Sequence, residues 1–225
     1  MNRLDFLFGL TSPLPNAILK KHPQGHLRQW WGENPQLYSP NMGDLHAHLG
    51  GHTGIDIATF HRDPVYAAHD GYIPQGMLFN DPTRPGGREV WVYSPILDGE
   101  LPLNSQVTTV YCHLDEIAVK EGQQVKQGQL LGYEGNTGFV VSGGTQYWGN
   151  APANKGTHLH FGLYELMFKD GKWQQRYPVD LPLRGSSDPL PYITESAARP
   201  EGDITGLSLL VGRMASYLKK KFGSA

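Results

Sequence analysis

Cysteine is almost absent from this chain of 225 residues, which contains a single one, Cys112. One cysteine excludes an intrachain disulfide, so the fold must be stable without a covalent cross-link. Hydrophobic residues make up 39% of the chain, which is enough to build a core of that kind.

Long apolar runs and an excess of one charge are also missing. No stretch approaches the ~20 apolar residues that a membrane-spanning helix needs. Near the N-terminus Asp5 interrupts a short apolar run and no small-residue cleavage site follows, so we expect no signal peptide. Lysine and arginine number 19 against 21 acidic residues, a net charge of −2, which gives no general attraction to nucleic acid.

Glycine and proline, by contrast, are abundant, with 28 and 17 residues, and the chain must turn often. Between the turns lie short alternating runs rich in β-branched and aromatic residues. These runs are PVYAA (64–68), EVWVY (89–93), QVTTVYC (106–112) and THLHFGLY (157–164). They predict a mainly β protein, a sandwich or partly closed barrel, over residues 39–194, preceded by an N-terminal extension (1–38) that packs on it.

Residues 195–225 follow a different pattern, because apolar side chains recur there at helical spacing. The stripe consists of Ile204, Leu207, Val211, Met214 and Leu218. We therefore predict a linker and a C-terminal amphipathic helix. Its stripe is too narrow and short to be stable alone, so we expect it to pack against the β domain or the N-terminal region of Trp30 and Trp31. Pairing of two chains and binding to a membrane surface are the alternatives.

Ten histidines stand out, and several fall in metal-ligand patterns. His52 and Asp56 are four residues apart and can reach one ion if the chain turns at Gly54. On a strand, His158 and His160 share a face, and His113 follows a predicted strand.

Two imidazoles and a carboxylate with an open fourth position are typical of catalytic zinc. His52, Asp56 and one histidine of the second pair supply such a set, and the residues alone leave open whether it is His158 or His160. A competing pair, His46 and His48, lies close by in the sequence.

Five blocks occur in a fixed order over residues 50–165. They are GGHTGIDIA, PVYAAHDG, VYCHL, VKEGQQVKQGQLLGYEGNTG and THLHFGLYE. In these blocks the chain resembles the lysostaphin-type, or LytM-domain, zinc metallopeptidases, which are peptidoglycan endopeptidases. The resemblance implies antiparallel β-sheets around an open groove (the duplicated hybrid motif) and zinc-dependent hydrolysis of a peptide bond in the bacterial cell wall.

Carried over residue by residue, the resemblance implies that His52, Asp56 and His160 bind Zn²⁺ and that His113 and His158 are catalytic. It places the protein at the cell wall, outside the cytoplasm, and phage-type release or association with a virion would account for the expected lack of a signal peptide. Two other functions remain open: a zinc-holding adaptor that activates other wall hydrolases, and, on the hairpin-like segment 119–132, a carrier module.

One departure from the family pattern is an insertion, residues 139–156, which contains Tyr147 and Trp148. We expect it to border the groove, either as a wall that contacts substrate or as a surface insertion without a role. Loop 94–105 is a second candidate wall.

Overall fold

The computed structural model describes residues 6, 7, 9–34, 51–97, 105–153, 155–175 and 182–193. Almost all of the regular structure in this part is β-strand, broken by turns at the glycines and prolines. In chain order the elements are β1 (Leu27–Gln29), β2 (Gly54–Ile57), β3 (Pro64–Tyr66), β4 (Gly71–Tyr72), β5 (Leu78–Phe79), β6 (Arg88–Tyr93), β7 (Ser105–Leu114), β8 (Glu116–Ile117), β9 (Gln124–Val125), β10 (Leu130–Tyr133), β11 (Val140–Ser142), β12 (Thr145–Tyr147), β13 (Leu159–Lys169), β14 (Lys172–Gln175), the 3-10 turn η3 (Pro182–Gly185), β15 (Ser186–Ser187) and the 3-10 turn η4 (Leu190–Tyr192).

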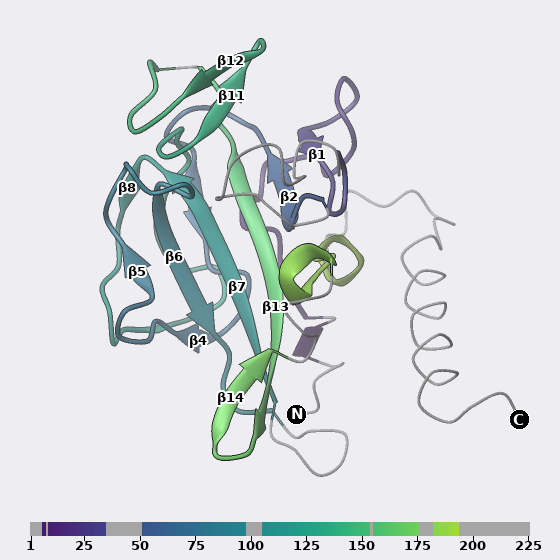
Figure 1. The fold of residues 1–225 in the computed structure, drawn as a ribbon, viewed down its shortest axis with the longest axis vertical. Helices are drawn as coiled ribbons and strands as arrows, with labels where there is room; N and C mark the ends of the chain where they lie inside the picture. Colours follow the sequence, from purple (N-terminus) through teal and green to yellow (C-terminus); the bar gives the residue numbers. More distant parts are fainter. Residues whose placement is uncertain are drawn as a thin grey trace, which may run out of the picture.

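One large antiparallel sheet dominates the fold, with strand order β1-β2-β13-β7-β6-β4-β9. β5 pairs with β6, and both β14 and β15 pair with β13. The two longest strands, β7 and β13, lie side by side at the centre (Figure 1). Alternate residues of β13, namely Leu159, Phe161 and Leu163, are fully buried, which is the period-2 pattern that the sequence predicts.

The core lies on the face of the large sheet that these residues occupy. It is shared with a three-stranded sheet of order β3-β10-β8, whose Val65 and Leu131 belong to the same buried cluster as Tyr111 and Phe161. The rings of Tyr111 and Phe161 pack with centroids 5.3 Å apart. The prediction of a mainly β, antiparallel fold is therefore confirmed, whereas the duplicated hybrid motif stays a prediction.

The N-terminal segment 9–34 packs into the same core. Leu14, Leu19 and Leu27 are members of its buried cluster, and β1 extends the large sheet by pairing with β2. The predicted domain limits, 1–38, 39–194 and 195–225, remain predictions. The predicted helix over 203–222 lies outside the described residues.

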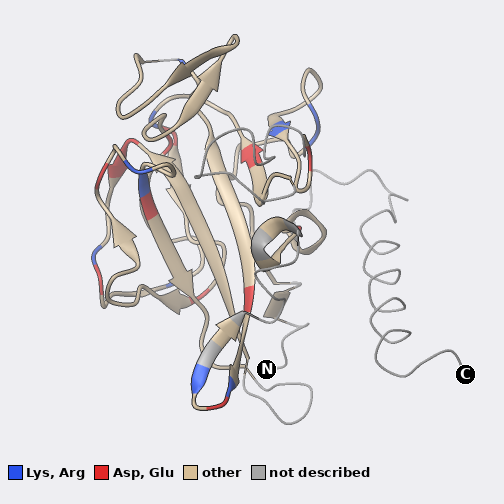
Figure 2. Cartoon of the chain, viewed as in Figure 1, with Lys and Arg blue, Asp and Glu red and all other residues tan. Residues whose placement is uncertain are grey.

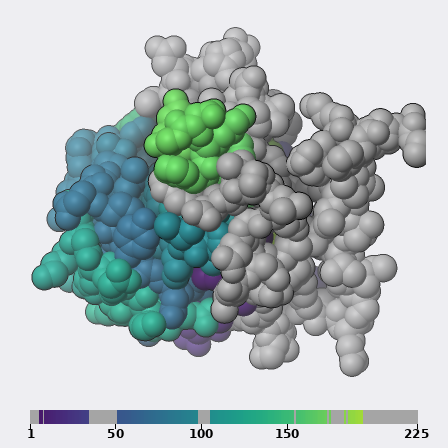
Figure 3. Space-filling view, turned by 90° about the horizontal axis from the view of Figure 1, so that it is seen from below, coloured from purple at the N-terminus to yellow at the C-terminus, as the bar shows by residue number. Residues whose placement is uncertain are grey.

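Charged residues of both signs occupy the loops and strand ends, whereas β7 and β13 are uncharged over most of their length (Figure 2). The hairpin of β13 and β14 stands out at the surface when the molecule is seen from below (Figure 3). Within the described residues, no helix is both long and apolar enough to cross a membrane.

A buried carboxylate ties the loop after β2 to β10. Glu134 is fully buried, and Thr59 donates to it through both its backbone amide and its hydroxyl group. Burial raises the pKa of Glu134 from 4.5 to about 7 against the opposing effect of these bonds. Glu134 therefore keeps a proton in the folded chain at pH values where the unfolded chain releases it.

We predict that this carboxyl group makes the protein less stable as the pH rises from about 4.5 to about 7, by up to about 3 kcal/mol. Glu134→Gln cannot ionise, so its melting temperature relative to wild type should be higher at about pH 8 than at about pH 5. Glu116→Gln, at an exposed position on β8, is the matched control. An equal difference at both pH values for Glu134→Gln would contradict the prediction.

Candidate metal centre

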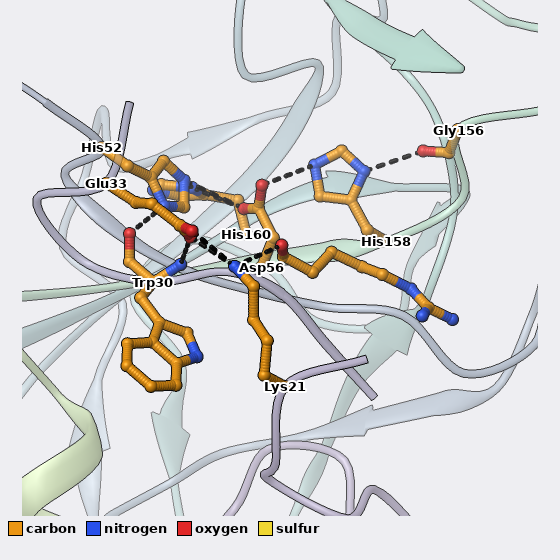
Figure 4. A network of polar contacts seen from close by, with 9 residues as sticks. Lys21, Trp30, Glu33, His52, Asp56, Gly156, His158 and His160 are labelled. Atoms are coloured by element: carbon orange, nitrogen blue, oxygen red, sulfur yellow. Dashed lines mark hydrogen bonds and ion pairs between the residues drawn. The ribbon is translucent and has the colours of Figure 1, made fainter. Parts of the chain in front are cut away.

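His52, Asp56 and His160 meet because β2 and β13 are neighbours in the sheet. Asp56 lies directly opposite His160 in the strand register, and His52 lies two residues before Gly54, the first residue of β2. Nε2 of His52 lies 3.0 Å from Oδ1 of Asp56 and 2.8 Å from Nδ1 of His160, and the latter two atoms are 3.2 Å apart. Figure 4 shows the three side chains converging.

These three atoms form a set that can hold a metal ion. Ligand atoms about 2.1 Å from a tetrahedral zinc are separated by roughly 3.4 Å, so the edges of the observed triangle, 2.8 to 3.2 Å long, need to open by about 0.2 to about 0.6 Å. Two imidazole nitrogens and a carboxylate oxygen also match the donor types that zinc prefers. The residues present therefore fit a zinc ion with one position left open for another ligand.

Contacts outside the triangle fix which atom of His52 faces it. Nδ1 of His52 lies 3.2 Å from the backbone carbonyl oxygen of Trp30. A carbonyl only accepts hydrogen bonds, so Nδ1 carries the proton and the lone pair is on Nε2. His160 instead presents Nδ1 to the triangle.

Charge in the triangle is arranged for a cation. Burial acts to raise the pKa of Asp56, but His52, His158 and His160 together hold that pKa well below its ordinary value. Burial lowers the pKa of His160 despite the opposing effect of Asp56. At neutral pH the aspartate is therefore ionised and the His160 imidazole keeps a free lone pair.

Two further imidazoles stand beside the triangle. Nδ1 of His113 lies 2.7 Å from the carbonyl oxygen of Thr137, and Nδ1 of His158 lies 2.7 Å from that of Gly156. Both Nδ1 atoms therefore donate to their carbonyls, and each Nε2 takes no part in that bond. The two ring centroids are 4.6 Å apart, and Nε2 of His158 is 3.7 Å from Oδ2 of Asp56.

The backbone of His113, at the end of β7, is strained because its φ is +63°. Three bonds hold this corner: the His113 amide donates to Gly86, the Thr137 hydroxyl donates to the Leu114 carbonyl, and the Arg88 amide donates to the Thr137 hydroxyl. Burial, with His158 and His160 adding to it, lowers the pKa of His113 well below its ordinary value. Its Nε2 is thus unprotonated at neutral pH.

All five of these side chains line one cavity of about 1030 Å³. The N-terminal segment forms one wall through Arg28, Gln29 and Asn34, and the insertion forms another through 139–144. Trp91 and Tyr164, with rings stacked 5.7 Å apart, continue the floor over β6 and β13.

The insertion therefore does border the cavity, but not through the aromatic residues expected. β11 and β12 form a hairpin whose first strand lines the cavity. Tyr147 and Trp148 are not among the lining residues, and Trp148 packs on Phe139 with ring centroids 5.0 Å apart. Residues 98–104 of the other candidate wall lie outside the described residues.

The glycine between His52 and Asp56 lies in a strand. The sequence allows a turn at Gly54 as the way in which His52 and Asp56 could reach one ion, whereas Gly54 begins β2 and lies opposite Gly162 of β13. A side chain is excluded there because a Cβ atom would lie 2.5 Å from the Phe161 carbonyl oxygen and 2.9 Å from the His160 ring. His46 and His48, the competing pair, lie outside the described residues.

Two features of the site have little or no signal in the sequence: the groups that orient the imidazoles, and the wall formed by the N-terminal segment. The carbonyls of Trp30, Thr137 and Gly156 are backbone atoms, so no residue type signals them. The GNTG motif around Thr137 is the one visible sign of such a contact. Arg28 and Gln29 carry no motif at all.

The sequence profile of Peptidase family M23 matches residues 50–176, more than half of the chain. The chain belongs to this family. The M23 match contains the metal triangle and both neighbouring histidines, and it excludes the N-terminal segment 9–34.

Among curated relatives, the peptidoglycan DD-endopeptidase ShyA of Vibrio cholerae is 33% identical over 135 residues, which are 60% of this chain and 24% of that protein. The glycyl-glycine endopeptidase ALE-1 of Staphylococcus capitis is 28% identical over 153 residues, 68% of this chain and 35% of that protein. The chain thus spans about a quarter to a third of the length of these relatives.

Solved structures of similar chains include a zinc-containing peptidase from Vibrio cholerae, with 25% identity, a TM-score of 0.41, and coverage of 69% of this chain and 37% of that one. Lysostaphin from Staphylococcus simulans has 19% identity, a TM-score of 0.48, and coverage of 87% of this chain and 60% of that one.

We predict that Gly54→Ala destabilises the fold by about 2 kcal/mol and weakens Zn²⁺ binding at least about tenfold, because the added methyl group displaces the β13 backbone and the His160 ring. Gly162→Ala is the matched control, since a Cβ atom there meets its neighbours at 3.4 Å or more. Thermal unfolding and zinc titration measure both effects. Equal values for the two variants would disprove the steric role of Gly54.

Proposed function

We propose that this chain is a zinc-dependent endopeptidase that hydrolyses peptide bonds of bacterial peptidoglycan. The observation that carries the proposal is the placement of a metal-ligand triangle and two carbonyl-anchored imidazoles on one open cavity. Membership of family M23 supports it, as do relatives named as peptidoglycan endopeptidases. In this proposal the protein acts at the cell wall, and residues 39–194 are the catalytic domain.

His52, Asp56 and His160 would hold the zinc ion. When bound, zinc supplies a Lewis acid that polarises a carbonyl group and makes a water molecule more acidic. As ligands the two imidazoles are neutral and Asp56 supplies one negative charge, so a bound Zn²⁺ would keep a net positive charge for this purpose.

His113 and His158 are the proposed catalytic residues. Each has an Nδ1 anchored to a backbone carbonyl, so each ring is fixed in direction, and burial lowers the pKa of His113 so that its Nε2 can accept a proton. The proton taken from the attacking water can then pass to the departing amine. The resulting imidazolium can also donate a hydrogen bond to the oxygen on which negative charge develops.

Replacing a metal ligand should remove most bound zinc, whereas replacing another histidine of the cavity should not. We expect His160→Ala to lose most bound zinc, because two protein ligands hold zinc far more weakly than three. His61→Ala changes a cavity-lining histidine outside the triangle and should keep one zinc per chain. Metal analysis of both purified variants is the measurement, and full zinc content in His160→Ala would refute the ligand assignment.

Catalysis should be lost without loss of metal when the other two histidines change. His113→Ala and His158→Ala should each retain zinc and lose about a hundredfold or more in turnover on purified cell walls, because a proton acceptor is removed. The released amino and carboxyl ends, measured with and without a chelator, identify the bond that is cut. Wild-type turnover in either variant would contradict its role.

The same assay decides between an enzyme and an adaptor. An adaptor that holds zinc releases no new peptide ends by itself on any wall preparation. If the zinc-loaded wild-type chain behaves in that way, the proposal of an endopeptidase is wrong.

A further inference from the structure

Arg28 stands in the wall of the metal-containing cavity but comes from outside the part of the chain that matches family M23. It lies on β1, which pairs with β2 so that Gln29 is opposite Asp56. Its side chain is exposed, and it lines the same cavity as the metal triangle. The family match begins at residue 50, so this wall is an addition to the shared domain.

Arg28 differs from the other arginines whose side chains the structure describes. Within those residues its guanidinium group makes no hydrogen bond or ion pair, whereas each of the other three has polar partners. Arg62 pairs with Asp115 and Glu116, Arg84 pairs with Glu89, and Arg88 bonds to Asn80, Asn150 and the Asp115 carbonyl. The neighbouring cation Lys21 has a partner as well, because its Nζ lies 2.5 Å from Oε2 of Glu33 (Figure 4).

Among the described residues that line the cavity, no acidic group compensates the charge of Arg28. Asp56 is surrounded by imidazoles at the metal triangle. Glu89 is buried, and it accepts hydrogen bonds from the Trp91 indole and the Arg84 guanidinium group. Within the described residues, a ligand that enters along β1 therefore meets a positive charge without a partner and a planar array of donors, which suits a carboxylate group.

We propose that Arg28 is a specificity-determining residue that binds a free carboxylate of the substrate peptide, close to the bond that is cut. This inference rests on the proposed function and narrows its substrate class to peptides with an unamidated carboxylate at that place. Peptidoglycan stem peptides fit the requirement, since they contain acidic residues whose carboxylate is either free or amidated.

A purely structural role for Arg28 is the competing explanation. Its charge acts on the buried Glu134, whose pKa it lowers slightly against the larger effect of burial. If that were its purpose, replacing Arg28 would change stability and leave substrate preference alone. The two roles therefore have different readouts.

The test compares two synthetic stem peptides that differ only in whether the carboxylate is free or amidated. We expect wild type to cleave the free form with a kcat/KM about tenfold higher, mainly through KM. In Arg28→Gln the free-to-amidated ratio should fall towards one. Arg28→Lys, which keeps the charge without the planar fork, should give an intermediate ratio. The control Lys120→Gln removes an exposed cation outside the cavity and should keep the wild-type ratio.

Two checks keep this inference separate from the proposed function. Zinc content and melting temperature of Arg28→Gln should equal those of wild type, because the side chain is exposed and lies outside the triangle. If wild type cleaves both peptides in a chelator-sensitive way but with equal kcat/KM, or if Arg28→Gln keeps the preference, the carboxylate site is wrong and the endopeptidase stands. If neither peptide nor intact cell wall is cleaved, the endopeptidase itself is wrong.

Discussion

The pairing of β2 with β13 is the interaction on which the rest of this structure depends. It sets Asp56 opposite His160, and the close approach at Gly54 brings the His160 ring within reach of His52. The same two strands bury Ile55, Ile57, Leu159 and Phe161 on their other face. The metal triangle and the hydrophobic core are therefore two faces of one strand pair, and a change of register by one residue would destroy both.

The core and the metal triangle could be predicted largely from the sequence because their signals are periodic or belong to particular residue types. Leu159, Phe161 and Leu163 alternate with polar neighbours, and that alternation alone places His160 on the opposite face. The choice of His160 over His158 as a ligand needed the family resemblance. Spacing gives a face, but it does not say which of two imidazoles on that face lies opposite Asp56.

The parts that the sequence did not predict are those that depend on contacts between distant backbone segments. From the sequence, Gly54 permits a turn, but a glycine is equally compatible with a strand that another chain segment approaches closely, which is what the structure shows. The N-terminal wall was not foreseen, since β1 is short and Arg28 belongs to no motif. In both cases the deciding fact is the tertiary neighbour, which one-dimensional patterns do not contain.

Three imidazoles of the site take their orientation from backbone carbonyls, those of Trp30, Thr137 and Gly156. A carbonyl is present whatever residue carries it, and it does not titrate. The loops that hold the histidines can therefore accumulate substitutions without losing a proton-holding partner, provided that their paths are kept. Such an arrangement makes the direction of the three rings depend on the path of the backbone and not on the side chains of the cavity walls.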